Sequence, residues 1–115
     1  LRLTSPRDGT EGLWHYSHLH GLMPKLGFFI GQEPRLPFDF DEALALVAPR
    51  PVLLMAPELD RYVNAEDVRL EVEGPRKIYR ILGREDALIL DTPSDFNRFK
   101  AERQKQVLDW IIQLQ

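Results

Sequence analysis

Two short runs of apolar residues stand out along the chain. Val52–Ala56 reads VLLMA between Pro51 and Pro57, and Leu88–Leu90 reads LIL ahead of a polar stretch. A short, continuous apolar run is typical of a strand that is covered on both faces, as in a parallel sheet. We therefore predict a strand at each of these two places.

Capping residues and helical spacing predict a helix on either side of the first strand. Asp39 followed three positions later by Glu42 is typical of a helix start, and Pro49 ends that helix. Asn64 can cap the second helix, which carries acidic residues in its first turn and extends to Gly83. Its apolar residues recur at spacings of three or four and are Val68, Val72, Ile78 or Tyr79, and Leu82.

The second helix contains a glycine and a proline, Gly74 and Pro75, in its interior. Because an interior proline costs about 3 kcal/mol, we expect a kink or a split at this point. A third helix is predicted over Ala101–Leu114. Its apolar face is formed by Val107, Leu108, Ile111 and Ile112.

The order helix, strand, helix, strand, helix predicts an α/β fold with a parallel sheet. Two strands are too few to cover these helices. We therefore expect further strands from a part of the protein upstream of Leu1, and we interpret the chain as the C-terminal portion of a larger domain. The sequence divides into a loop-rich, aromatic and histidine-containing segment at 1–37 and the α/β portion at 38–115.

Composition and charge narrow the classes of function. The chain has 115 residues, no cysteine and a net charge of −3, with acidic and basic residues interleaved. No basic stripe is present to bind nucleic acid, and no apolar run is long enough to cross a membrane. Disulfides and thiolate chemistry are excluded. Neither glycine-rich phosphate-binding motif occurs, so no cofactor is expected. The cellular compartment is left open.

Site residues are expected in the loops after the two strands, because open α/β sheets bind ligands at the carboxyl ends of their strands. Asp60 lies four residues past the first strand. At this place a carboxylate can orient a histidine and stabilise the imidazolium that forms during acyl transfer. From spacing alone the alternative is that Asp60 closes a turn, or pairs with Arg61 ahead of the Asn64 cap.

The sequence around Asp60 resembles a known family. Ala45–Leu54 contains the stretch APRPVLL, Asp60 follows it, Lys77–Gly83 reads KIYRILG, and the closing helix contains an Asp-Trp pair. This set resembles the C-terminal end of the α/β-hydrolase fold, in the branch of dienelactone hydrolases and acetyl xylan esterase-like proteins. The resemblance covers about Phe38–Leu114. It implies that Asp60 is the acid of a Ser-His-Asp triad.

The chain departs from this family at the histidine of the triad. The family places that histidine in the loop after the last strand, where Thr92–Phe99 reads TPSDFNRF and Arg98 stands at the expected position. A guanidinium does not give up a proton near neutral pH, so Arg98 cannot act as a general base. We expect Arg98 instead to form an ion pair with Asp60 that closes the mouth of the site.

The histidines of the chain all lie in one segment, HYSHLHG, as His15, His18 and His20. One interpretation is that His18 or His20 folds over the strand ends and replaces the missing base; a second is that the H-x-x-H-x-H spacing binds Zn²⁺. The third is that the imidazoles bond backbone carbonyls or carboxylates in an aromatic-rich loop. No acidic residue is close enough in sequence to complete a metal site, so no metal is expected.

These observations lead to two functional hypotheses. No G-x-S-x-G motif occurs, so a nucleophilic serine would lie upstream. In the first hypothesis the chain is the C-terminal part of a serine ester hydrolase for a small-molecule carboxylic ester, with acylated carbohydrates as one candidate. Its partner is then the missing N-terminal half of the domain, and the chain alone is inactive. In the second, it is a catalytically silent α/β-hydrolase-like module that serves binding or structural support.

Overall fold

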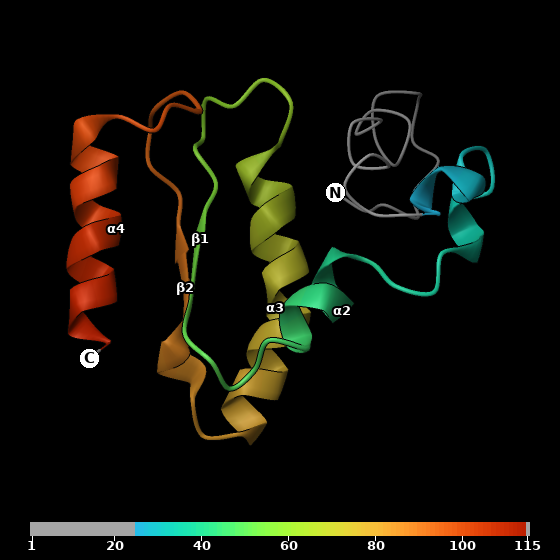
Figure 1. Ribbon diagram of the computed structural model, residues 1–115, viewed down its shortest axis with the longest axis horizontal. Coiled ribbons are helices and arrows are strands. Elements are labelled where there is room, and N and C mark those ends of the chain that lie inside the picture. Colours follow the sequence, from blue (N-terminus) through green and yellow to red (C-terminus); the bar gives the residue numbers. More distant parts are fainter. Residues whose placement is uncertain (1–24, 115) are drawn as a thin grey trace.

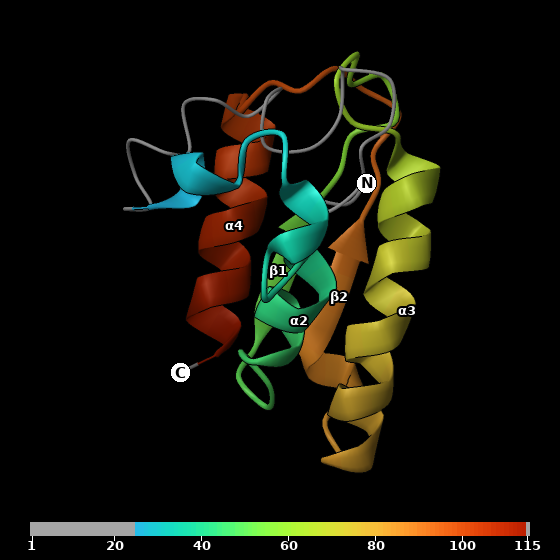
Figure 2. The same cartoon turned by 90° about the vertical axis from the view of Figure 1, so that its right-hand side faces the viewer.

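The computed structural model describes residues 25–114, and these form a mixed α/β arrangement with a two-stranded sheet (Figure 1). The parallel strands β1 (Val52–Met55) and β2 (Leu88–Asp91) lie between two layers of helix. Helices α2 (Phe40–Ala45) and α3 (Ala65–Ile81) lie on one face of the sheet, and α4 (Ala101–Gln113) lies on the other (Figure 2). The predicted order of helices and strands and their parallel pairing are confirmed.

Single turns of 3-10 helix supplement these elements. Two precede α2, at Leu26–Phe29 and Glu33–Arg35, and a third, at Glu85–Ala87, leads into β2. Around the first two turns, Leu36 is buried in a small apolar cluster. Its partly buried neighbours are Phe29, Ile30, Phe38 and Phe40, so the cluster includes residues from both sides of position 37.

The predicted helix caps are formed. The side chain of Asp39 accepts a hydrogen bond from the backbone N–H of Glu42, and the Asp39 N–H donates to Glu42 Oε2 over 2.7 Å, which completes a capping box. Asn64 Oδ1 accepts the Glu66 N–H over 2.8 Å at the start of α3. Gly83 follows the last turn of α3 with a φ of +68°, where a residue with a Cβ would be strained.

Helix α3 is continuous through Gly74 and Pro75, so of the predicted kink or split, the split is wrong. The reason is tertiary: Pro75 is buried in the apolar stripe that packs α3 on the sheet. The burial of its ring there opposes the intrinsic cost of an interior proline. The stripe consists of Ala65, Val68, Val72, Pro75 and Tyr79.

Tyr79 lies at the C-terminal end of this stripe. Its side chain is fully buried, and its hydroxyl donates a hydrogen bond to the Arg50 carbonyl over 2.7 Å. Burial raises the pKa of the Tyr79 phenol. The helix therefore places Tyr79, and not Ile78, in the core, because Ile78 is exposed.

The two faces of the sheet are covered unequally. Val52, Leu54 and Leu90 pack into the core with α3. On the other face a hollow of about 460 Å³ lies between α4 and the side chains of Leu53 and Ile89. Coverage on both faces was predicted, but among residues 25–114 the sheet is closely packed on the α3 side alone.

Helix α4 is held to the sheet by polar contacts. Arg103 Nη1 and Gln106 Nε2 both donate to Asp91 Oδ2, over 3.0 and 2.9 Å. The helix has no buried residue, and three members of its predicted apolar face are 44–64% exposed. Those three are Leu108, Ile111 and Ile112. The prediction of the helix is confirmed, and most of its predicted apolar face is exposed.

Candidate functional site

The loops that follow β1 and β2 meet at the carboxyl end of the sheet. The Glu58 N–H donates to the Pro93 carbonyl over 2.9 Å, and the Leu59 N–H donates to the Asp95 carbonyl over 3.1 Å. These contacts continue the parallel pairing beyond the strands. They bring the 57–64 loop and the 92–100 loop side by side at the edge where ligands of open α/β sheets bind.

Arg69, from the first half of α3, fastens both loops to the helix. Its guanidinium donates to Glu58 Oε1 over 2.9 Å, to Glu66 Oε2 over 3.0 Å and to Thr92 Oγ1 over 2.6 Å. The hydrogen bonds to Glu58 and then to Glu66 raise the pKa of Arg69. One cationic group thereby links the starts of both loops to α3.

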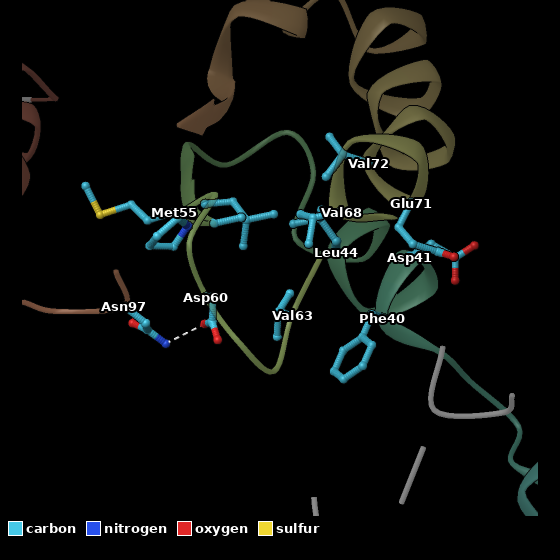
Figure 3. Close-up of a pocket in the computed structure, with 13 residues that line it drawn as sticks. Phe40, Asp41, Leu44, Met55, Asp60, Val63, Val68, Glu71, Val72 and Asn97 are labelled. Carbon is cyan, nitrogen blue, oxygen red and sulfur yellow. Dashed lines mark hydrogen bonds between the residues drawn. The ribbon is translucent and has the colours of Figure 1, made fainter. Parts of the chain in front are cut away.

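Asp60 is held in the mouth of this site by a turn and by a contact with the second loop. Its Oδ1 accepts the Tyr62 N–H over 2.8 Å, so the turn proposed as the alternative role of Asp60 is present. Its Oδ2 accepts a hydrogen bond from Asn97 Nδ2, also over 2.8 Å (Figure 3). The carboxylate therefore points from the loop after β1 toward the loop after β2.

The expected ion pair between Arg98 and Asp60 is not formed among residues 25–114. Asn97, one residue earlier, supplies the donor to Asp60, and the Arg98 guanidinium lies 5.1 Å from the centroid of the Phe96 ring. The Arg98 side chain is thus engaged with an aromatic ring of its own loop. Asn97 was not predicted from the sequence, because a charged or titratable side chain was expected as the partner of Asp60.

A pocket of about 340 Å³ lies beside Asp60 and Asn97. Its walls come from β1, α2, α3 and the two loops (Figure 3). Asp41 and Glu71 lie together on the α2 and α3 side, across the pocket from the hydrogen-bonded Asp60 and Asn97. Most of the lining is aliphatic, with Leu44, Leu54, Met55, Ala56, Pro57, Val63, Val68 and Val72. Such a cavity suits an apolar group, with polar contacts at its rim.

The loop after β2 is fixed by Asp95 as well. Lys100 Nζ donates to Asp95 Oδ2 over 2.7 Å, and the Phe96 N–H donates to Asp95 Oδ1 over 2.8 Å. The hydrogen bond from Lys100, followed by the one from the Phe96 amide, lowers the pKa of the Asp95 carboxyl. Asp95 therefore stays ionised and holds the segment that presents Asn97.

The other candidate catalytic residues, His18 and His20, lie outside the described residues, as does His15. Across residues 25–114 no group of three or more histidine or acidic side chains is placed to hold a metal ion. None of the helices in that range is long and apolar enough to cross a membrane.

The site thus combines the hydrogen-bonded pair Asp60 and Asn97 with an apolar pocket, whose lining also includes Asp41 and Glu71. Arg69 joins both loops to α3. Asp60 is brought to the place that the sequence predicted, at the carboxyl end of β1. Comparison of the chain with protein-family models, with curated proteins and with solved structures gave no match.

Proposed function

We propose that the chain is the acid-bearing portion of an α/β-hydrolase-type serine ester hydrolase. One observation carries the proposal: the Asp60 carboxylate lies on the rim of an apolar pocket and accepts a hydrogen bond from the loop after the next strand. A triad acid needs this placement, because it must orient an imidazole that stands above the strand ends. The resemblance of the sequence around Asp60 to that family supports the same reading.

In this proposal the pocket receives the acyl or alcohol part of a carboxylic ester. Its aliphatic lining favours an apolar substituent, and Asp60 holds a histidine from another part of the protein in the tautomer that accepts the serine proton. His18 and His20 are the candidates within this chain, and the serine comes from outside it. An acylated carbohydrate is one ester of the class.

A second candidate function has an observation of its own. Asn97 donates to Asp60 with an N–H, as the imidazole of a triad would, but an amide cannot take up a proton. This contact favours a catalytically silent module that retains the pocket for binding. The two candidates differ in whether an activated serine is present in the natural-length protein.

The test is covalent labelling of the natural-length protein with a fluorophosphonate, followed by mass mapping of the modified peptide. If the protein is a serine hydrolase, we expect the label on a serine that lies upstream of this chain. The label should be lost in Asp60→Ala and retained in Asp86→Ala, which removes an exposed carboxylate from the turn before β2. Absence of any label on folded protein would reject the hydrolase in favour of the silent module.

A further inference from the structure

The Asp60 carboxylate lines the pocket without a cationic partner from residues 25–114. Its Oδ1 accepts the Tyr62 N–H and its Oδ2 accepts an N–H of Asn97 Nδ2, each over 2.8 Å, and both donors are neutral. No ion pair among these residues involves Asp60. A carboxylate offers about four acceptor positions, so each oxygen can accept a further hydrogen bond.

The arginines that adjoin Asp60 and Asn97 in sequence are directed to other groups. Arg61 donates to the Tyr62 hydroxyl, and its guanidinium carbon lies 4.5 Å from the centroid of the Tyr62 ring. The guanidinium carbon of Arg98 lies 5.1 Å from the centroid of the Phe96 ring. The described lining of the pocket contains neither of them and no other lysine or arginine. A ligand in the pocket therefore meets the charge of Asp60 and no positive side chain of that lining.

The pocket beside Asp60 has room for an apolar group. Its volume is about 340 Å³, and its wall includes the buried side chains of Val68 and Val72 and the half-buried side chain of Val63. Asp60 and Val63 come from the same loop and line the same cavity (Figure 3). A ligand whose charged group bonds Asp60 can therefore place an attached apolar group against the aliphatic wall.

A cationic head group suits this carboxylate better than a neutral or anionic one. A ligand that covers Asp60 removes water from a charge, and this costs free energy unless a donor of opposite charge replaces that water. An ammonium group supplies three N–H donors and no acceptor, and its hydrogen bonds to a carboxylate are charge-assisted. An anionic head group would be repelled by the same carboxylate.

We propose that the pocket binds a small organic ammonium ion, which donates to Asp60 and places its apolar part in the aliphatic cavity. The inference deepens the second candidate function, the silent module that keeps its pocket for binding. It rests on that function, because a serine hydrolase would commit Asp60 to a histidine. The ligand takes the place at the carboxylate that an imidazolium takes in an intact triad.

The test is a nuclear magnetic resonance titration of the full 115-residue chain that follows the Asp60 carboxyl carbon and the Val63 methyl groups. The probes are 2-naphthylmethylammonium, its neutral counterpart 2-naphthylmethanol, and methylammonium, which has the charge but no apolar body. We expect the first probe to bind saturably and to shift both sets of signals. The other two should bind at least about tenfold more weakly. Equal affinity for the first probe and either of the others would overturn the inference.

Matched variants assign the charge contact to Asp60. D60N keeps the shape of the side chain and removes its charge, so it should weaken binding of 2-naphthylmethylammonium about tenfold and leave binding of 2-naphthylmethanol unchanged. D86N removes an exposed carboxylate from the turn before β2 and should bind both probes as the unmodified chain does. Unchanged binding of the ammonium probe in D60N would overturn the inference.

The comparison of the three probes on the unmodified chain does not depend on the folding of any variant. The fluorophosphonate label tests the function and the titration tests the pocket, so failure of one is seen separately from failure of the other.

Discussion

At the scale of single residues, Asp95 links the protonation of one carboxyl to the position of Asn97. Its hydrogen bonds from Lys100 and from the Phe96 amide lower its pKa in the folded chain. A carboxyl with a lowered folded pKa contributes stability that is complete above its ordinary pKa, about 4. That contribution is lost as the pH falls through the lower folded value.

We predict that K100Q moves the pKa of Asp95 back toward its ordinary value, because the largest cause of the shift is removed. The pKa is measured from the carboxyl carbon signal in a titration by nuclear magnetic resonance. K105Q is the matched control, since Lys105 pairs with Asp109 on α4 and not with the loop. An unchanged Asp95 pKa in K100Q would show that the ion pair does not form in solution.

Residue patterns predicted the place of Asp60 but not its hydrogen-bond partner. Asp60 was found because its position depends only on the end of β1, which a run of apolar residues marks clearly. The partner depends on how two loops meet, and here Asn97 rather than Arg98 reaches the carboxylate. Asn97 could have been considered from the sequence, because an Asn side chain in the loop after a neighbouring strand can donate an N–H to a carboxylate.

At the scale of elements, the glycine within α3 and the glycine that follows it have opposite roles. Gly74 is within the helix, and a Cβ added there meets its nearest neighbour, Asp41 Oδ2, at 4.0 Å, an ordinary contact distance. Gly83 follows the helix with a φ of +68°, a conformation that costs an L residue about 1–2 kcal/mol. The same substitution should therefore change stability in opposite directions at these two sites.

We predict that G74A stabilises the chain by about 1 kcal/mol, because alanine has the higher helix propensity and fits without a clash. G83A should destabilise it by about 1–2 kcal/mol. Both are measured by urea unfolding followed by circular dichroism, each against the unmodified chain. Destabilisation by G74A would mean that the contact between α2 and α3 is tighter at this point than the structure has it.

The elements themselves were predictable where local interactions decide them. The capping box at Asp39, the cap at Asn64 and the end of α3 at Gly83 each depend on residues within one turn. Pro75 does not break the helix, because its ring is buried in the folded chain and the periodicity within the helix carries no information on tertiary burial. The exposed apolar face of α4 has the same origin: spacing predicts a face but not what covers it.

At the scale of the whole molecule, the two outer edges of the sheet differ. At the β2 edge, the Leu88 carbonyl accepts a hydrogen bond from Arg76 Nη1 over 3.4 Å. At the β1 edge, the backbone groups of Leu53 and Met55 point away from β2, because Ala56 N–H bonds the Asp91 carbonyl in this register. No strand within residues 25–114 pairs with that edge. An edge that no strand of the described residues pairs with is a place for strand addition, as the proposed hydrolase domain requires.

Hydrogen exchange tests this difference directly. In the 115-residue chain, the Leu54 and Ala56 amides face β2 and should exchange at least about tenfold more slowly than those of Leu53 and Met55, which face the outer edge. In the natural-length protein, a further strand beside β1 should slow Leu53 and Met55 to the level of Leu54. Exchange is read for each amide by nuclear magnetic resonance, and Leu54 serves as the internal reference in both proteins.

Equal rates for all four amides in the 115-residue chain would contradict the register. Fast exchange of Leu53 and Met55 in the natural-length protein would place β1 at the edge of the complete sheet, and would exclude a hydrolase-type domain in which this strand is internal.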